Sequence, residues 1–404
     1  MSKFLNYKFL NQANVYILLW CVYYLQGTIY ASGSLLSQSI LLILLLISLC
    51  NYLKVVTTYK LPLYFRGLNT LLLMFILYGI VLLLSGQKII IQETFTVSSN
   101  HEYLKSVLIS LLPIFSAFLY TKQGLLTPKM MRLWIPIWIL IALLSYYSYQ
   151  QLALSILVTR DEITNNVAYR FVALMPILIL LYKKPIFMFC AILFCLLFIL
   201  MGMKRGAILI AAVNLLIVLF YMYKVGSKKM KFFIILSSFI ICVALVISIE
   251  QLLLSSDYFA SRIDATLDGD TSGRGDIYSS FWNYFINQSN LLNLLFGNGA
   301  DATLIIGYNY AHNDWLEILI NQGVIGASIY LLYFILFYKS ILYRGIGNPF
   351  VYIGLKMIFS TVFLSTIFSM SYASMDIFLS LSLGFFLALS NINNNCNCKN
   401  KYTK

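Results

Sequence analysis

Charged residues are scarce in this chain of 404 residues, and acidic ones are scarcer than basic ones. Asp, Glu, Lys and Arg make up 10% of the sequence, hydrophobic residues make up 61%, and the mean hydropathy is +0.85. Soluble domains are about 45–50% apolar and about 25% charged. The composition therefore excludes a water-soluble globular enzyme. It predicts a polytopic integral membrane protein, since each spanning helix uses about 20 predominantly apolar residues.

The sequence also lacks the short signatures of several chemistries. It has no C-x-x-C, Walker or serine-nucleophile motif, and none of its seven cysteines lies in a long polar loop, so no disulfide framework is expected. A lone C-x-C at 396–398 is weak evidence for a metal site, and the aspartates between 264 and 276 do not follow a calcium-binding loop. We therefore expect no cofactor. The net charge of +14 comes without a basic run that has interleaved aromatics, which argues against nucleic-acid binding.

Twelve apolar runs, separated by turn and charge signals, predict an all-α fold with about twelve transmembrane helices. The predicted spans are 13–30, 34–50, 67–85, 104–120, 133–150, 167–182, 186–202, 206–223, 232–250, 315–338, 352–370 and 375–391. We divide the chain accordingly into spans one to nine (1–250), a large loop (251–314), spans ten to twelve (315–391) and a polar cytoplasmic tail (392–404). The first run, preceded by Lys3 and Lys8, has features of a signal peptide, but we interpret it as an uncleaved first span.

Positive charge is expected to stay on the cytoplasmic side of membrane loops. With the N-terminus in the cytoplasm, 20 of the 28 Lys and Arg residues face inward, and the other 8 face outward together with all 14 acidic residues. A topology wrong by one span would mix these groups. We therefore predict that both termini are cytoplasmic.

The loop from Gln251 to Asp314 is the one segment large enough for an extramembrane lobe, and it falls on the outer side. Loops of this length are uncommon unless they are functional or disordered. Its apolar residues recur at helical spacing, which predicts an ordered amphipathic helix over Ile277–Leu295, capped by Asp276. The apolar side of this helix would rest on the membrane surface or on the helical bundle, with Arg274 beside its N-terminus.

Basic residues on the outer side are informative because the charge bias opposes placing them there. Lys204 and Arg205 occupy a short turn between two apolar runs, where a cation needs a partner, and Arg274 stands between two glycines. A guanidinium suits the bidentate recognition of phosphate oxygens, so both arginines are candidates for binding an anion. The alternatives are that Lys204 and Arg205 extend to lipid headgroups, and that Arg274 pairs with Asp270 or Asp276.

Of the two histidines, His312 is the stronger candidate for chemistry, because it opens a polar stretch at the mouth of span ten. Imidazole moves protons near neutral pH. Asp314 and Glu317 lie within about one helical turn of it and would orient it or hold an incoming hydroxyl. The alternative is a surface histidine with capping carboxylates, which is how we interpret His101.

Four stretches, taken in order, resemble the superfamily of O-antigen polymerases and O-antigen ligases, which are bacterial envelope glycosyltransferases. They are Thr164-Asn165-Asn166-Val167-Ala168-Tyr169, Lys204-Arg205-Gly206-Ala207, Ser272-Gly273-Arg274 followed by Phe296-Gly297-Asn298-Gly299, and His312-Asn313 through Gly323-Val324-Ile325-Gly326. Their order and topology cover residues from roughly 160 to 340. Lys204 stands where the family usually has serine.

The resemblance implies a GT-C-like, nearly all-helical fold that transfers glycan from an undecaprenyl diphosphate donor at the outer face of the bacterial cytoplasmic membrane, without a metal. Arg205 and Arg274 would hold the donor diphosphate, and His312 would deprotonate or align the acceptor hydroxyl for an inverting attack. A second group would make further contacts to donor or acceptor: Arg160, Arg170, Asn166, Lys204, Asn313, Asp314 and Glu317. Candidate partners in the same pathway are a chain-length regulator and a flippase.

Polymerase and ligase share these parts and differ in acceptor, which is a lipid-linked repeat unit for the polymerase and lipid A core for the ligase. We favour the polymerase because such enzymes are numerous and each polysaccharide locus tends to carry its own. Its product would be the O-antigen of lipopolysaccharide or a capsule. A flippase or another transporter also fits twelve spans. Transporters, however, place charged groups within spans along a substrate path, whereas every acidic residue here falls near the outer side.

Overall fold

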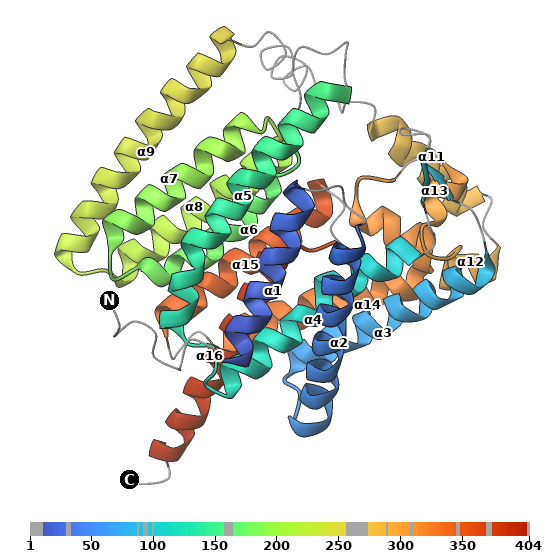
Figure 1. Cartoon of the computed structure of the whole chain (residues 1–404), viewed down its shortest axis with the longest axis horizontal. Coiled ribbons are helices and arrows are strands. Elements are labelled where there is room, and N and C mark those ends of the chain that lie inside the picture. The colour runs from blue at the N-terminus through green and yellow to red at the C-terminus, as the bar shows by residue number, and fades with distance from the viewer. Residues whose placement is uncertain are drawn as a thin grey trace.

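The computed structural model describes residues 11–29, 34–86, 89–91, 96–98, 101–156, 165–255, 274–287, 290–307, 310–344, 348–368 and 374–401. This part of the chain is almost entirely helical (Figure 1). Its strands are β1 (Ile89–Ile91) and β2 (Thr96–Ser98), which pair in a short antiparallel hairpin. The sequence analysis did not predict this hairpin.

Each of the twelve predicted apolar runs coincides with a helix. These helices are α1 (Gln12–Ile29), α2 (Leu35–Thr58), α3 (Leu63–Ser85), α4 (His101–Lys122), α5 (Pro128–Ile156), α6 (Ala168–Leu178), α7 (Pro185–Met201), α8 (Arg205–Val225), α9 (Lys228–Ser255), α14 (Asp314–Arg344), α15 (Pro349–Phe368) and α16 (Ile377–Lys401). Among the described residues, α2 to α5, α8, α9, α14 and α15 are long and apolar enough to cross a membrane, and three further apolar helices are shorter. The prediction of a polytopic membrane protein is confirmed, while the full count of twelve spans stays a prediction.

Small residues let central helices approach closely. α16 packs along α4, and a Cβ atom on Gly384 would lie only 2.1 Å from the carbonyl oxygen of Ile114. The two helices are also joined by a hydrogen bond, in which Ser380 Oγ of α16 donates to the Ser110 carbonyl oxygen of α4 at 2.7 Å. Membrane helices commonly pack through small residues and such bonds, because lipid supplies no hydrophobic driving force between them.

A buried amide holds α15 against α8. Asn214 is fully buried, its Nδ2 donates to Thr361 Oγ1 at 2.7 Å, and its Oδ1 accepts from Ser360 Oγ at 2.6 Å. Both polar atoms of this amide are thus hydrogen-bonded in an apolar interior, where an unpaired polar atom would be costly. The contact sets the two helices side by side and leaves the last residue of α15 near the first residues of α8.

A helical lobe follows α9 and lies at one end of the bundle beside α14 (Figure 1). In the described part of the chain, its helices are α11 (Arg274–Asn287), α12 (Leu291–Phe296) and α13 (Ala302–Ile306). The single helix predicted over Ile277–Leu295 is wrong in its bounds, since α11 begins at Arg274 and Asp276 lies in its first turn. Asn290 Oδ1 accepts from Asn293 N at 2.8 Å, so a side-chain cap starts α12 as a separate helix.

The lobe packs against α14 and the segment before it through a small separate apolar cluster, and it has an apolar outer face. Phe281 packs with Ala311 and Ile320, whereas Trp282 and Leu291 are 50% and 71% exposed. Large apolar residues exposed next to membrane helices suit contact with the lipid surface. The expectation that the apolar side of this segment rests on the membrane surface or on the bundle is compatible with this packing.

α14 is interrupted at Gly323, whose φ of 69° and ψ of −169° are not helical. Such an interruption frees carbonyl groups in the preceding turn. Asn298 N and Nδ2 both donate to the Ile320 carbonyl oxygen at 3.0 Å, and Gly299 N donates to the Asn321 carbonyl oxygen at 3.0 Å. The loop that follows α12 therefore supplies hydrogen-bond donors to the carbonyl groups at the break. Irregular backbone in membrane helices requires such protein partners.

Candidate functional site

The end of α15 is the point at which two separated arginine motifs meet. Gly206 follows Arg205 at the start of α8, and a Cβ atom on this glycine would lie 2.8 Å from Phe368 Cβ, at the last residue of α15. Arg274, the first residue of α11, donates from Nη1 to the Phe368 carbonyl oxygen at 3.5 Å, which is the long limit for a hydrogen bond. Both arginines are half-buried beside one helix end.

The segment that carries His312 lies against the same helix end. Trp315, in the first turn of α14, donates from Nε1 to Thr366 Oγ1 of α15 at 2.9 Å. Tyr278 of α11 donates from its hydroxyl to the His312 carbonyl oxygen at 3.4 Å. The three residues predicted to be catalytic therefore lie on elements that meet at one place.

Two helix N-termini add positive potential here. Arg205 and Arg274 are the first residues of α8 and α11, where backbone N–H groups lack helical partners and the helix dipole is positive. Lys204, at the N-cap of α8, makes no side-chain capping bond. Met203 and His312 both have a φ of 51°, a left-handed conformation that costs such residues about 1–3 kcal/mol and is concentrated at functional sites. The arrangement suits an anion.

Asn313 and Asp314 shape the start of α14. Asn313 Oδ1 accepts from Trp315 N at 3.0 Å and from Leu316 N at 3.3 Å, so it caps the helix. Asp314 is fully buried and accepts from the Tyr330 hydroxyl at 3.0 Å. Both were predicted to contact substrate, which stays a prediction; their protein partners show that they also order the start of α14.

Glu317 supports the backbone next to His312. Its carboxylate is fully buried and accepts from Ala311 N at 2.7 Å, from Asn321 Nδ2 at 3.3 Å and from the Thr303 hydroxyl. These bonds tie α13 and the residue before His312 to α14. The sequence analysis placed Glu317 near the histidine, and the structure shows how it orders the segment that bears it.

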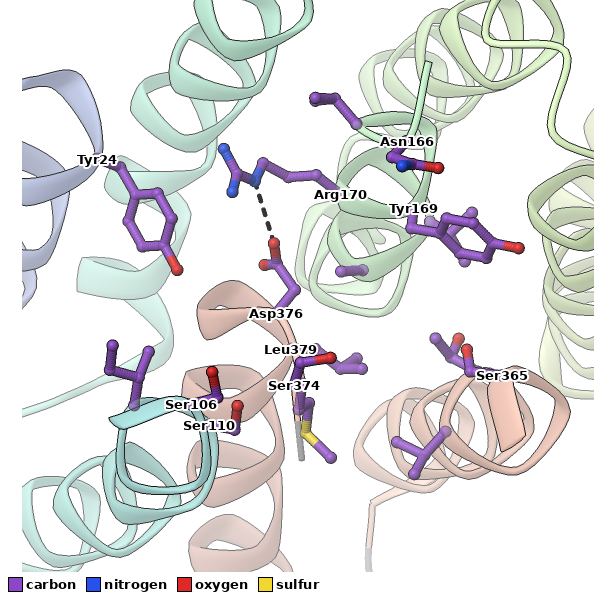
Figure 2. Close-up of a pocket in the computed structure, with 17 residues that line it drawn as sticks. Tyr24, Ser106, Ser110, Asn166, Tyr169, Arg170, Ser365, Ser374, Asp376 and Leu379 are labelled. Carbon is purple, nitrogen blue, oxygen red and sulfur yellow. Dashed lines mark hydrogen bonds and ion pairs between the residues drawn. The ribbon is translucent and has the colours of Figure 1, made fainter. Parts of the chain in front are cut away.

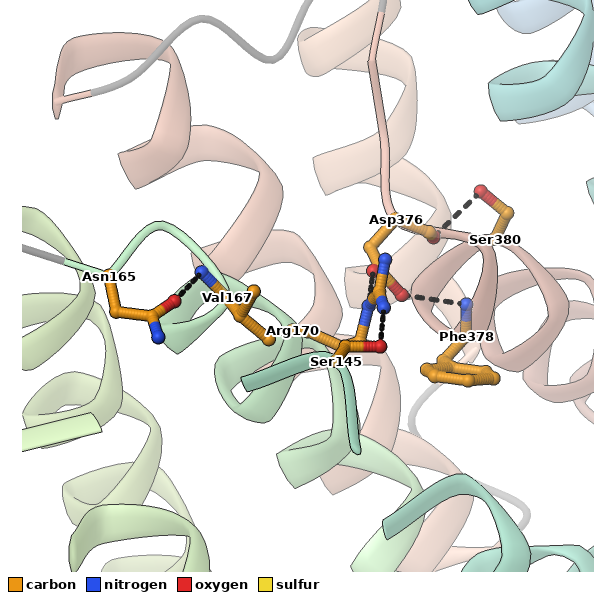
Figure 3. Close-up of polar contacts among 7 residues, drawn as sticks. All are labelled: Ser145, Asn165, Val167, Arg170, Asp376, Phe378 and Ser380. Carbon is orange, nitrogen blue, oxygen red and sulfur yellow. Dashed lines mark hydrogen bonds and ion pairs between the residues drawn. The ribbon is translucent and has the colours of Figure 1, made fainter. Parts of the chain in front are cut away.

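The Asn165-Asn166 stretch contacts the turn that leads to Arg205. Asn165 is buried, its backbone N–H donates to the Gly202 carbonyl oxygen at 3.0 Å, and its Oδ1 accepts from Val167 N at 2.9 Å (Figure 3). Asn166, the residue predicted to bind substrate, is exposed. The first and second motifs are thus packed together, and Asn166 faces outward from this contact.

A cavity of about 410 Å³ opens beside Asn166, between α1, α4, α6, α15 and α16 (Figure 2). Hydroxyl and amide groups interrupt its otherwise apolar lining. The uncharged polar residues that line it are Tyr24, Ser106, Ser110, Asn166, Tyr169, Thr361, Ser365 and Ser374.

Arg170 forms an ion pair at the wall of this cavity. Its Nε donates to Asp376 Oδ2 at 3.1 Å, its Nη1 donates to Ser145 Oγ at 2.6 Å, and its guanidinium lies 4.6 Å from the Tyr24 ring centroid (Figures 2 and 3). Asp376 Oδ1 also caps α16 by accepting from Phe378 N at 2.9 Å. The sequence analysis missed Asp376. Its position before an apolar run is typical of a helix cap, but nothing local reveals its pairing with Arg170.

One predicted contact residue, Arg160, lies outside the described residues. In the described ranges, no three His, Cys, Asp or Glu side chains come together as a group that could hold a metal ion. Metal independence stays a prediction.

Burial of Asp301 predicts a pH-dependent stability of the lobe. Asp301 is 8% exposed, and burial raises the pKa of its carboxyl from 3.8 to about 6. The folded state therefore binds this proton more tightly than the unfolded chain. The contribution of this carboxyl group to the free energy of unfolding is fully present below pH 3.8 and is lost as the pH rises through about 6. We expect Asp301→Asn to remove this decline and to raise thermal stability above pH 6. Melting curves of both proteins in detergent from pH 4 to 8 test this, and curves that stay parallel contradict it.

The fold and site define a polytopic membrane protein with a cationic site at the meeting point of several helix ends. Residues 190–331 match the family model described as O-Antigen ligase. That stretch, which contains Arg205, Arg274 and His312, is a domain of the O-antigen ligase and polymerase family. No curated protein matches the chain.

Proposed function

We propose that the chain is a polysaccharide polymerase that transfers a growing glycan from undecaprenyl diphosphate to a lipid-linked repeat unit at the outer face of the cytoplasmic membrane. The supporting observation is that the elements bearing Arg205, Arg274 and His312 meet at the end of α15. All three residues lie in the stretch that matches the family model. The polymerase is preferred to other members because such enzymes are numerous and polysaccharide loci tend to carry their own.

In this proposal, Arg205 and Arg274 bind the diphosphate of the donor. Guanidinium groups bind phosphate oxygens in bidentate pairs, and the N-termini of α8 and α11 add partial positive charge. When the bond between the anomeric carbon and the phosphate oxygen breaks, the leaving undecaprenyl diphosphate takes the electron pair. Fixed positive groups stabilise that charge as it develops, so the proposal requires no metal ion.

His312 receives the proton of the acceptor hydroxyl, or aligns that hydroxyl, while its oxygen forms the new bond to the anomeric carbon. Imidazole is the side chain most often used for proton transfer in catalysis. Attack from the side opposite the diphosphate inverts the configuration at the anomeric carbon. The contacts of Asn313 and Glu317 hold the backbone on which this histidine lies.

The proposal includes the orientation predicted from charge. With twelve spans and both termini in the cytoplasm, the large loop (251–314) lies on the outer side, and residues 392–404 lie on the cytoplasmic side. The distribution of acidic residues supports this, since all 14 fall on the outer side in that topology.

A ligase is the second candidate, because the matched family model is described as O-Antigen ligase. The same donor site would serve it, with lipid A core as acceptor. Transport of a lipid-linked oligosaccharide is less well supported, since the cations of the site lie at helix ends and not along a path through the spans.

The test is to incubate the purified full-length protein in nanodiscs with a synthetic undecaprenyl-diphosphate repeat unit from its own locus. A ladder of multimers supports the polymerase. A single product that forms only after lipid A core is added replaces it with the ligase. Folded protein that forms no product with either acceptor overturns both and favours transport.

A further inference from the structure

The cavity beside Asn166 plays no part in the transfer step described above. Its volume of about 410 Å³ falls in the range typical of small-molecule sites, about 300–1,000 Å³. Residues from distant parts of the chain converge on it, and their hydroxyl groups surround its interior (Figure 2). Such a concave site with a few placed polar groups is suited to a small, polar ligand.

The ion pair gives this cavity hydrogen-bonding groups without net charge. The Arg170 and Asp376 side chains are 19% and 18% exposed, and their charges neutralise each other. Arg170 uses Nε and Nη1 on Asp376 and Ser145, while its Nη2 makes no hydrogen bond to a described residue. Each carboxylate oxygen of Asp376 has a lone pair beyond the one already used. The wall therefore offers a donor next to an acceptor.

A donor next to an acceptor matches two neighbouring hydroxyl groups on a sugar ring. Tyr24 and Tyr169 supply aromatic surface to the same cavity. A diphosphate would meet no net positive charge here, and a prenyl chain would displace water from the ion pair and the serine hydroxyls without hydrogen bonding to them, which is costly. The lining thus selects a neutral sugar over both charged and apolar parts of a lipid-linked glycan.

The cavity lies one side chain away from the cationic site. Tyr169 lines it, and the Tyr169 hydroxyl lies 2.5 Å from the place that a Cβ atom on Gly206 would occupy. Gly206 directly follows Arg205. Ser365 lines the cavity from α15, three residues before Phe368. A sugar bound in this cavity is therefore close to the place where the donor diphosphate would be held.

We propose that this cavity binds the terminal neutral sugar of the acceptor glycan, with the Arg170–Asp376 pair contacting two of its hydroxyl groups. The inference rests on the proposed function. A donor is held by its diphosphate, but the reacting sugar of an acceptor repeat unit is the part farthest from its own diphosphate, so its hydroxyls must be recognised directly. A site that hydrogen-bonds a hydroxyl rejects ligands without it strongly.

The first test compares Asp376→Asn with wild type. Asparagine still offers an oxygen to Phe378 N, so the cap of α16 is kept while the charge is lost. We expect the KM for the acceptor to rise at least about tenfold with kcat little changed, as for the loss of a hydrogen bond to a charged group. Wild type should have a higher KM for acceptors that lack one terminal hydroxyl than for the complete acceptor, whereas the variant should show no such difference. The matched control is Glu102→Gln, which removes the half-exposed Glu102–Lys105 ion pair on α4, whose two residues do not line this cavity.

The second test fills the cavity with both residues of the ion pair kept. Ser374 is exposed at its edge, so Ser374→Trp adds bulk without burying a new side chain in the core. Binding of the free repeat-unit oligosaccharide, which lacks lipid and diphosphate, is measured by saturation-transfer NMR. We expect binding to wild type and to Arg205→Gln, and its loss in Ser374→Trp.

The outcomes separate this inference from the proposed function. Wild-type transfer with an unchanged acceptor KM in Asp376→Asn, or oligosaccharide binding that survives Ser374→Trp, overturns the cavity as the acceptor site and leaves the polymerase intact. Absence of transfer by wild type refutes the proposed function, whereas oligosaccharide binding that is lost in Ser374→Trp would still identify the sugar site.

Discussion

Arg205→Gln and Arg274→Gln proteins are expected to accumulate normally in the membrane and to form glycan product at rates about 10²–10³-fold below wild type. Each change removes a positive group that would stabilise the leaving diphosphate. Folding should tolerate either change, because both side chains are only half-buried and the bond from Arg274 to Phe368 is long, at 3.5 Å. Initial rates with a labelled lipid-linked donor, at saturating acceptor, measure the effect.

Two further variants show whether the loss is specific. Arg66→Gln is the matched control, because Arg66 is an exposed arginine at the other end of the bundle, on α3, and it should keep the wild-type rate. Lysine at position 205 or 274 should give intermediate rates, since an ammonium carries the charge but cannot bind phosphate in bidentate fashion. A wild-type rate in either glutamine variant would remove that arginine from the proposed mechanism, and an equal loss in Arg66→Gln would point to a general effect of charge.

The helices could be predicted from the sequence because each depends on a local apolar run. Their ends could not be placed as well. α5 begins at Pro128, five residues before the predicted span, since Thr127 and Pro128 start a helix that carries basic residues in its first turns. The short β1–β2 hairpin could not be predicted because it lies between two apolar runs and its sequence has none of the short turn sequences typical of hairpins.

The site residues could be recognised one at a time, but their arrangement could not. Arg205 and Arg274 stood out because cations on the outer side are unfavourable without a use. Their meeting at Phe368 depends on the packing of α15 against α8, which no local pattern encodes. Asp376 was missed for the same reason, since its partner Arg170 is 206 residues away in the chain.

The contact between Gly297 and Gly323 is the second place where a single substitution should have a large effect. Gly323 has a φ of 69°, and a Cβ atom on it would lie 2.5 Å from both Gly297 N and the Leu295 carbonyl oxygen. These are backbone atoms, which cannot rotate away as a side chain would. Gly323→Ala is therefore expected to cost about 3–5 kcal/mol, the sum of left-handed strain and overpacking.

Gly124→Ala is the matched control for the strain. Gly124 has a similar φ of 74° in the turn between α4 and α5, but no atom lies within 4 Å of the position of its added Cβ. Its substitution should cost only the conformational part, about 1–2 kcal/mol. Unfolding of both variants in detergent, followed by tryptophan fluorescence, compares the two costs. Equal losses would show that the two backbones can separate without penalty.

The loss of stability in Gly323→Ala should also be local, because this contact supplies hydrogen-bond partners to the carbonyl groups at the break in α14. If Gly323→Ala pushes the loop after α12 away, Asn298 and Gly299 lose their bonds to the Ile320 and Asn321 carbonyl groups. Hydrogen exchange should then rise first in α12 and in the turns of α14 before the break, while α4 and α16 stay protected. Because His312 lies on the segment that enters those same turns, transfer should fail at temperatures where the rest of the bundle is still folded. A variant that keeps wild-type exchange in these turns yet loses activity would contradict this order of events.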